Sequence, residues 1–223
     1  MRVELQQIRK SYPLPGGDGT VAALDGVDLV IESGTLCILK GPSGSGKTTL
    51  LSVISGLSRP TSGSVLLDGT VVRNPLDRQR GMVAHGFQEA VFIPELTVVE
   101  NLLLPALRCG DRLAVDRGER LLEAFGLGEM FDVPPAALSG GEKRRLNLAR
   151  SLFLPPRLLL IDEPAAYLDD GWQVKAMEMI IREVRDARAT LVMATHTPLP
   201  GDEGFRHILM HKGKVIDDGT SDY

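Results

Sequence analysis

The order of apolar and polar positions predicts a protein in which strands and helices alternate. Strands are expected where short apolar or alternating runs are bounded by turn residues. These segments are residues 1–33 with a turn at PGGDG, 35–41, 62–69, 157–164, 189–196, and 206–219 as a hairpin turning at Lys212-Gly213. Helices are expected at 171–188 and at 46–57, with one apolar face formed by Leu50, Leu51, Ile54 and Leu57. This alternation predicts an α/β fold.

One long region departs from the alternation. Residues 96–154 are rich in Leu and Ala and predict helices. The helical pattern is broken at Pro105, at Gly126/Gly128 and at Pro134-Pro135. A helical block between strands of one sheet suggests a subdomain inserted into the α/β core.

Composition excludes several classes of protein. The chain has 223 residues and a formal net charge of −4, and this mild acidity argues against a dedicated nucleic-acid binder. We expect neither a signal peptide nor a membrane span, because the N-terminus lacks an apolar run and no apolar stretch approaches about 18 residues. The two cysteines, Cys37 and Cys109, lie in no metal-binding pattern, and Cys37 is expected to be a buried thiol.

The segment GPSGSGKT at 41–48 fits the phosphate-binding loop GxxxxGK[ST] at every position. It lies between a predicted strand and a predicted helix, the context that this motif requires. Backbone amides and the helix N-terminus would hold phosphate, Lys47 would contact the β- and γ-phosphates, and Thr48 would bind Mg²⁺. The alternative is a Gly/Ser-rich turn with a solvated lysine. The expected nucleotide-binding residues are Gly41, Pro42, Ser43, Gly44, Ser45, Gly46, Lys47, Thr48 and Thr49.

Two carboxylates follow the apolar run at 158–161. Ligands of parallel α/β sheets bind at the carboxyl ends of strands, so Asp162 is placed to hold Mg²⁺ through water. Adjacent residues on a strand point to opposite faces, which leaves Glu163 to act as general base on the attacking water. Alone, the pair could equally be an acidic helix cap. The phosphate loop upstream favours the catalytic interpretation.

The segment LSGGE at 138–142 resembles the signature motif of ABC-type ATPases. Ser139 is expected to cap a helix that begins near Gly140, and Gly140 and Gly141 would let an anion approach its amides. With Glu142 in the first turn, the segment alone would pass for an ordinary capping box. The other motifs of the family follow in the expected order over residues 1–219.

Four further positions resemble functional residues of that family. Tyr12 matches the aromatic residue that stacks on adenine, although a tyrosine there could be a half-buried edge residue. Gln88 matches the Q-loop glutamine that contacts Mg²⁺ and the attacking water. Leu168-Asp169 resembles the D-loop, and His196 matches the switch histidine on the γ-phosphate. Without the other motifs, Gln88 would be interpreted as a surface glutamine. His196 would be interpreted as a structural histidine.

The resemblance implies the architecture and the chemistry of the protein. It implies a P-loop NTPase core of ABC ATPase type with an N-terminal antiparallel β-subdomain and an inserted α-helical subdomain. Residues 1–223 would form one domain, with 1–87 and 155–223 as the core and 88–154 as the Q-loop and signature subdomain. Two copies would hold two ATP molecules, with Mg²⁺, head to tail between them. The implied catalytic residues are Lys47, Gln88, Glu163 and His196, and the implied ligands of Mg²⁺ are Thr48, Gln88 and Asp162.

The passages SYPLPGGDGTVAALDGVDLVIESG and ELTVVENLLLPAL are similar to the group that contains LolD, FtsE and the ATPase part of MacB. This similarity implies an ATPase at the cytoplasmic face of the membrane, coupled to a separate integral membrane permease for lipoprotein, lipid or peptide export or for force transmission. The alternative is a soluble ABC ATPase without a membrane partner. The segment 91–94 would suit docking to such a partner but could equally be core.

Two sets of polar residues receive a plainer interpretation. The basic run after the signature is expected to be the solvated face of a helix, not a nucleic-acid contact. It consists of Lys143, Arg144, Arg145 and Arg150. The chain also departs from its group at His85-Gly86, at Lys143 and at Ala165-Ala166-Tyr167. These positions fall where the family contacts its partners.

Overall fold

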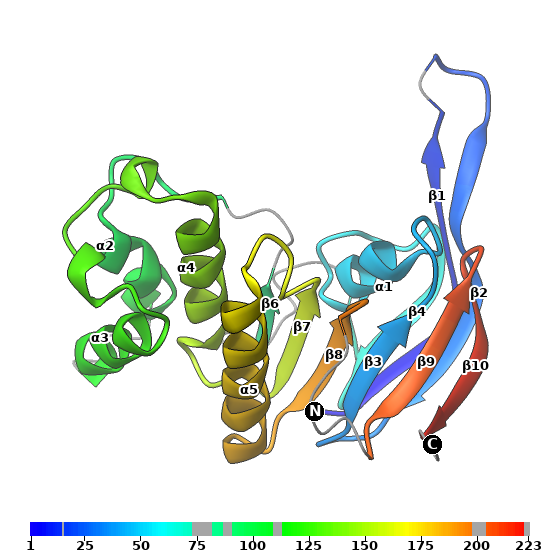
Figure 1. Ribbon diagram of the computed structural model, residues 1–223. Helices are drawn as coiled ribbons and strands as arrows, with labels where there is room; N and C mark the ends of the chain where they lie inside the picture. Colours follow the sequence, from blue (N-terminus) through cyan, green and yellow to red (C-terminus); the bar gives the residue numbers. More distant parts are fainter. Residues whose placement is uncertain (15, 73–81, 87–90, 109–112, 198–203, 221–223) are drawn as a thin grey trace.

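The computed structural model describes residues 1–14, 16–72, 82–86, 91–108, 113–197 and 204–220 (Figure 1). A four-stranded antiparallel sheet has the order β2-β1-β4-β5, and a six-stranded sheet has the order β10-β9-β3-β8-β7-β6. The strands of the first sheet are β1 (Val3–Pro13), β2 (Thr20–Ile31), β4 (Ser62–Leu67) and β5 (Thr70–Val71). Those of the second are β3 (Leu36–Lys40), β6 (Val83–Gly86), β7 (Leu158–Asp162), β8 (Thr190–Ala194), β9 (Arg206–His211) and β10 (Lys214–Thr220).

Helices cover the six-stranded sheet and extend beyond it. The α-helices are α1 (Lys47–Ile54), α2 (Val98–Leu103), α3 (Leu113–Ala124), α4 (Gly140–Leu152) and α5 (Asp170–Asp186). Short 3₁₀ turns are η2 (Leu104–Arg108), η3 (Gly128–Met130) and η4 (Pro135–Ala137). The helices α2, α3 and α4 gather at one end of the molecule, opposite the antiparallel sheet (Figure 1). The predicted helical region and its breaks are therefore confirmed.

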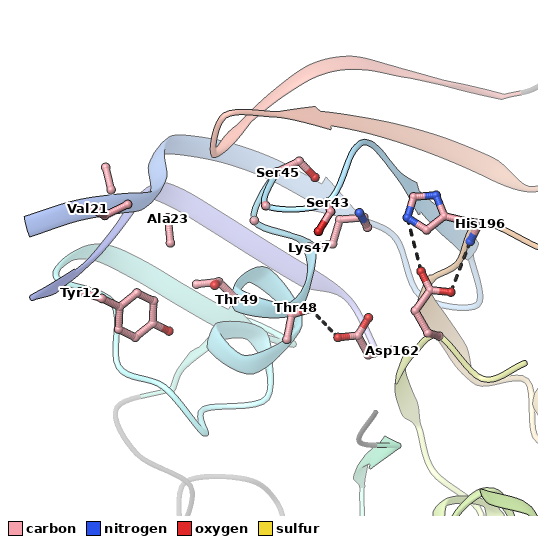
Figure 2. Close-up of a pocket in the computed structure, with 14 residues that line it drawn as sticks. Tyr12, Val21, Ala23, Ser43, Ser45, Lys47, Thr48, Thr49, Asp162 and His196 are labelled. Carbon is pink, nitrogen blue, oxygen red and sulfur yellow. Dashed lines mark hydrogen bonds and ion pairs between the residues drawn. The ribbon is translucent and has the colours of Figure 1, made fainter. Parts of the chain in front are cut away.

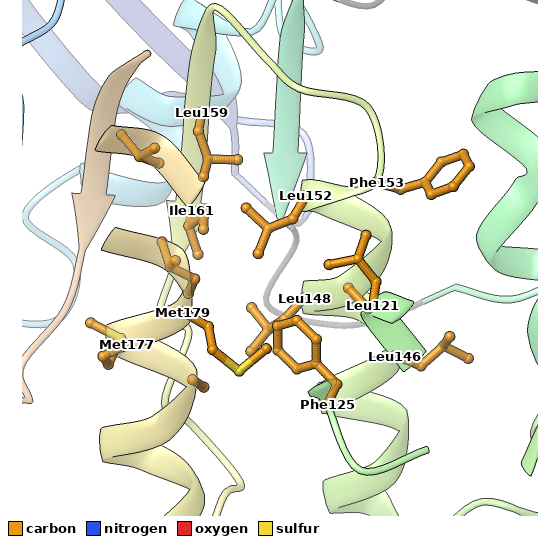
Figure 3. Packing of buried hydrophobic residues seen from close by; sticks show 14 of the residues in the cluster. Leu121, Phe125, Leu146, Leu148, Leu152, Phe153, Leu159, Ile161, Met177 and Met179 are labelled. Carbon is orange, nitrogen blue, oxygen red and sulfur yellow. The ribbon is translucent and has the colours of Figure 1, made fainter. Parts of the chain in front are cut away.

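The central strands are apolar on both faces because each face is buried. In β7, Leu158 and Leu160 belong to a core shared with α1 and the antiparallel sheet, whereas Leu159 and Ile161 pack with α4 and α5 (Figure 3). The pairings of β7 with β6 and with β8 are parallel. Continuous apolar runs are typical of such strands. The sheet thus fixes the carboxyl end of β7 between two packed layers.

Details of three sequence predictions can now be compared with the structure. Cys37 is fully buried as predicted, and burial raises the pKa of its thiol to about 12. Leu57 was expected on the apolar face of the first helix, but α1 ends at Ile54 and the Leu57 side chain is 42% exposed. The chain reverses at Gly56, whose φ of 69° is incompatible with continuing the helix. Within the described residues, no helix combines the length and hydropathy needed to cross a bilayer.

Candidate active site

The loop between β3 and α1 has no room for side chains at two glycines. A Cβ at Gly41 would lie 2.2 Å from the Met210 carbonyl oxygen, and one at Gly46 would lie 2.5 Å from that of Ala23. Both residues have positive φ values, 142° and 105°. Glycine is needed here because the loop is curled against β9 and β2.

The loop and the first turn of α1 form a site suited to an anion. Gly46 caps α1 without a side chain, and the first turn contains no acidic residue. The Lys47 ammonium group donates hydrogen bonds to the carbonyls of Gly41 at 2.7 Å and Pro42 at 3.1 Å. Ser45 is 2% exposed, and its hydroxyl has no hydrogen-bond partner among the described residues. A phosphate group would satisfy this hydroxyl and the helix amides together.

Thr48 and Asp162 meet at the end of β7. The Thr48 hydroxyl donates a 2.5 Å hydrogen bond to Oδ2 of Asp162, whose side chain is buried (Figure 2). Both groups are hard oxygen donors, the type that Mg²⁺ prefers, and Mg²⁺ usually takes its remaining ligands from phosphates and water. The two described members of the predicted metal set therefore fit the ion. Gln88, the third, lies outside the described residues.

Glu163 is directed away from Asp162 toward His196. Its Oε1 lies 3.5 Å from Nε2 of His196, and the His196 amide donates to Oε2 at 3.4 Å (Figure 2). The divergence of the two carboxylates was predicted from strand alternation, but its cause is different. Glu163 follows the strand in a left-handed conformation with φ 46°, and its amide donates to the Ala194 carbonyl at 2.8 Å.

These groups line one cavity of about 580 Å³. Tyr12 lies at one end of it and His196 at the other (Figure 2). Tyr12 is 41% exposed, and the Lys10 ammonium group lies 4.9 Å from the centre of its ring, so a stacked base would use the other face. The β2 residues Val21, Ala22 and Ala23 also line the cavity, and they were not predicted from the sequence. Val21 pairs with Tyr12 across the hairpin, so the strand register was the signal that could have identified it.

The signature residues and the D-loop aspartate do not line this cavity. The capping box predicted at Ser139 is present: the Glu142 amide donates to the Ser139 hydroxyl at 3.3 Å, and the Ser139 amide donates to the Glu142 carboxylate at 2.8 Å. Hydrogen bonds from the hydroxyl and the amide of Ser139 lower the pKa of Glu142. Asp169 caps α5 by accepting a hydrogen bond from the Trp172 amide. Ser139, Gly140 and Asp169 are exposed.

The prediction of a solvated basic face after the signature is wrong for three of its four residues. Arg144 is 3% exposed, Arg145 stacks on Trp172 at 4.2 Å, and Arg150 lies 4.9 Å from the centre of the Phe92 ring. Sequence alone could not show this, because beyond its exposed start α4 packs against β6, α2 and α5. Phe92 packs on the helical core, whereas Val91 is 80% exposed, so segment 91–94 is partly core and partly surface.

Comparisons with known proteins agree with this architecture. A family model described as "ABC transporter" matches residues 24–166. The lipoprotein-releasing system ATP-binding protein LolD of Anaeromyxobacter dehalogenans is 36% identical over 225 residues, covering 97% of this chain and 93% of that protein. The macrolide export ATP-binding/permease protein MacB of Syntrophobacter fumaroxidans is also 36% identical, over 88% of this chain, but the chain spans 28% of that protein.

A solved structure gives the same result at the level of the fold. A dimeric ATP-binding cassette in a post-hydrolysis state, bound to ADP and Pi, has a TM-score of 0.88 and 30% identity and covers 98% of both chains. The chain belongs to the ABC transporter family and is one of its ATP-binding ATPase subunits. The resemblance found in the sequence is thereby confirmed, both for the family and for the similarity to LolD and MacB.

Proposed function

We propose that this ATPase closes head to tail on a second copy of itself around two ATP molecules and transmits that motion to a separate membrane permease. The observation that carries the proposal is the separation of two phosphate-binding features. The cavity contains the phosphate loop, Asp162, Glu163 and His196, whereas the signature helix begins on an exposed surface outside it. A second subunit can bring its own signature to the open side of this cavity.

The side chains singled out in the cavity have distinct roles in this proposal. Tyr12 stacks on the adenine, while Lys47 and the Ser45 hydroxyl bind phosphate oxygens. Thr48 and Asp162 would hold Mg²⁺, and the chemistry that the ion would supply is neutralisation of negative charge on the phosphates. Gln88 lies outside the described residues, and the family resemblance alone assigns it to this site. The β2 residues around Val21 form the wall beside the base.

Hydrolysis depends on the pair formed by Glu163 and His196. Glu163 accepts a proton from the attacking water as general base. His196 contacts that carboxylate and lies at the end of the cavity where the γ-phosphate would be, so it can orient both. Loss of the γ-phosphate removes the group that only the closed dimer contacts from both subunits, and the dimer opens.

The membrane partner is inferred from relatives and from one surface. The names of similar proteins assign them to lipoprotein release and macrolide export. Export of a lipoprotein, lipid or peptide is therefore the proposed work of the complex, with this chain at the cytoplasmic face of the membrane. Val91 and Ile93, 80% and 43% exposed, are an apolar surface beside the helical region on which a permease could dock.

The variant Glu163→Gln tests the dimer and the general base together. It keeps the size of the side chain but cannot accept the proton, so kcat should fall by a factor on the order of 10² to 10⁴ while ATP binding remains. Gel filtration should then show an ATP-dependent dimer that persists. The matched control is Glu178→Gln, an exposed carboxylate on α5, which should behave as the unchanged protein. A monomer at saturating ATP would contradict the sandwich.

The membrane partner requires a separate experiment in the native cells. The Glu163→Gln protein carrying an affinity tag is purified from detergent-solubilised membranes with ATP, and co-purifying proteins are identified by mass spectrometry. Recovery of an integral membrane permease supports the proposal. Recovery of soluble proteins alone, in repeated preparations, would replace it with a soluble ABC ATPase that drives assembly or regulation.

A further inference from the structure

The Arg144 guanidinium group lies beneath the turn that follows β7. Its Nη2 donates to the carbonyl of Asp162 at 2.9 Å and to that of Glu163, and its Nε donates to the carbonyl of Pro164 at 3.3 Å. One side chain of the signature helix therefore binds three successive carbonyls around the catalytic glutamate. Arg144 is 3% exposed, and burial lowers the pKa of its guanidinium group. A buried cation is unfavourable unless such acceptors surround it.

The backbone that Arg144 holds is strained. Glu163 has a φ of 46°, which residues with side chains seldom adopt. Three groups fix this conformation: the Glu163 amide donates to Ala194, the Glu163 carbonyl accepts from the Ala166 amide at 3.1 Å, and Arg144 donates to the same carbonyl. The left-handed turn directs the carboxylate of Glu163 to His196, so its position depends on these contacts.

Arg144 also belongs to the element that carries the signature. It lies in the second turn of α4, whose first turn contains the capping box of Ser139 and Glu142. A helix transmits a displacement of its first turn to the second as a rigid body. A shift of α4 when the signature meets a partner's phosphate would therefore reach the Glu163 turn through hydrogen bonds already formed.

We propose that Arg144 is a positioning residue that couples the signature helix to Glu163 of the same subunit. The signature of one subunit faces the ATP held by its partner, whereas Glu163 acts on the ATP of its own cavity. Arg144 would thus make hydrolysis in one site depend on closure of the other. This inference rests on the proposed dimer and adds to it a specific link between the two sites.

The test compares Arg144→Met and Arg144→Lys with a matched control. Arg117→Met is that control, because Arg117 also donates to two successive carbonyls, those of Leu152 and Phe153, at the opposite end of α4. For Arg144→Met we expect kcat to fall about tenfold or more, since small misplacement of a catalytic group has effects of that order, with KM for ATP changed less than about twofold. Arg144→Lys should restore part of kcat, and Arg117→Met should retain it.

A second measurement separates positioning from folding. With ATP, the double variant Glu163→Gln/Arg144→Met should still form the dimer on gel filtration, because the signature and the phosphate loop are intact. The inference would be overturned if Arg144→Met kept its kcat or lost ATP binding. It would also be overturned if Arg117→Met lost as much kcat as Arg144→Met. If Arg144→Met does not fold, Arg144→Lys decides: unchanged kcat overturns the coupling, and a severalfold loss at constant KM supports it. Absence of a dimer in the Glu163→Gln protein at saturating ATP would instead refute the proposed function.

Discussion

Two helices of this protein begin at proposed phosphate sites, but their first turns differ. The first turn of α1 has a glycine cap, contains no acidic residue and begins with Lys47. The first turn of α4 carries its own anion, because Ser139 and the carboxylate of Glu142 form a capping box. The positive end of α1 is left for a ligand, whereas that of α4 is already partly neutralised within the chain.

This difference indicates that the site at α1 binds phosphate strongly and that the start of α4 binds it weakly. The loop at α1 contains the buried residues Lys47 and Ser45, and in the proposed cycle it holds the nucleotide of its own subunit. The start of α4 is exposed, and a phosphate that approaches it must compete with the Glu142 carboxylate for the same positive potential. A weak second contact is useful in a motor, since a dimer held too tightly would not reopen after hydrolysis.

Removing the cation at α1 should have the largest effect. In Lys47→Ala, the phosphates lose charge-assisted hydrogen bonds, each contributing about 1.5–3 kcal/mol, so ATP affinity should fall on the order of 1,000-fold. Equilibrium binding of ATP with Mg²⁺ measures this. Lys40→Ala, an exposed lysine at the end of β3, is the control and should bind normally. Undiminished affinity in Lys47→Ala would remove the lysine from the phosphate site.

The second-largest effect is expected when α1 receives an acidic first turn like that of α4. Thr49 occupies the third helical position of α1, as Glu142 does in α4. Thr49→Glu would complete an acidic first turn and repel phosphate, and we expect ATP affinity to fall roughly 100-fold. Thr49→Gln has nearly the same size without the charge and should bind far better. Equal affinity of the two variants would show that the field at this helix end is unimportant.

The reverse change at α4 should have a smaller effect of opposite sign. Glu142→Gln keeps an acceptor for the Ser139 amide but removes the negative charge that faces the incoming phosphate. Relief of about 1 kcal/mol of repulsion should tighten ATP-dependent dimerisation about fivefold. Analytical ultracentrifugation of the Glu163→Gln protein, with and without Glu142→Gln, gives the two dissociation constants. Weaker dimerisation would mean that the carboxylate itself contributes to the interface.

Ser139→Ala tests the cap as a structural element. The helix loses the hydroxyl that accepts from the Glu142 amide, and stability should fall by about 1 kcal/mol, the usual effect of an N-cap. Urea denaturation monitored by circular dichroism measures the change. Ser139→Asn, which retains a capping acceptor, should recover most of the loss. Equal stability of all three proteins would show that the cap contributes nothing.

The smallest expected effect is the pH dependence of this cap. Because hydrogen bonds from Ser139 lower the pKa of Glu142 in the folded state, the carboxylate stabilises the fold above its unfolded pKa of about 4.3. That contribution is lost as pH falls through the lowered folded value. The difference in thermal midpoint between the unchanged protein and Glu142→Gln should therefore shrink from pH 6 to pH 3. A constant difference would contradict this linkage.

Local patterns predicted the elements and the loop because their causes are local. The strands at 35–41 and 157–164, the hairpin at 206–219 and the capping box at Ser139 all follow from periodicity and turn chemistry within a few residues. Where the prediction needed distant partners, it was wrong or incomplete. Arg144 was assigned to a solvated helix face although it is buried, and the wall around Val21 was not identified.

The sequence by itself determined the class of the protein, because the phosphate loop, the carboxylate pair and LSGGE are contiguous motifs whose chemistry depends on neighbours in the chain. Only the tertiary structure decided which charged groups are buried and which face each other. Arg144 looks like one more cation of a basic run, yet α4 packs so that its guanidinium group meets carbonyls some twenty residues away. Burial of a charged side chain depends on packing between elements, and the local pattern around Arg144 does not encode it.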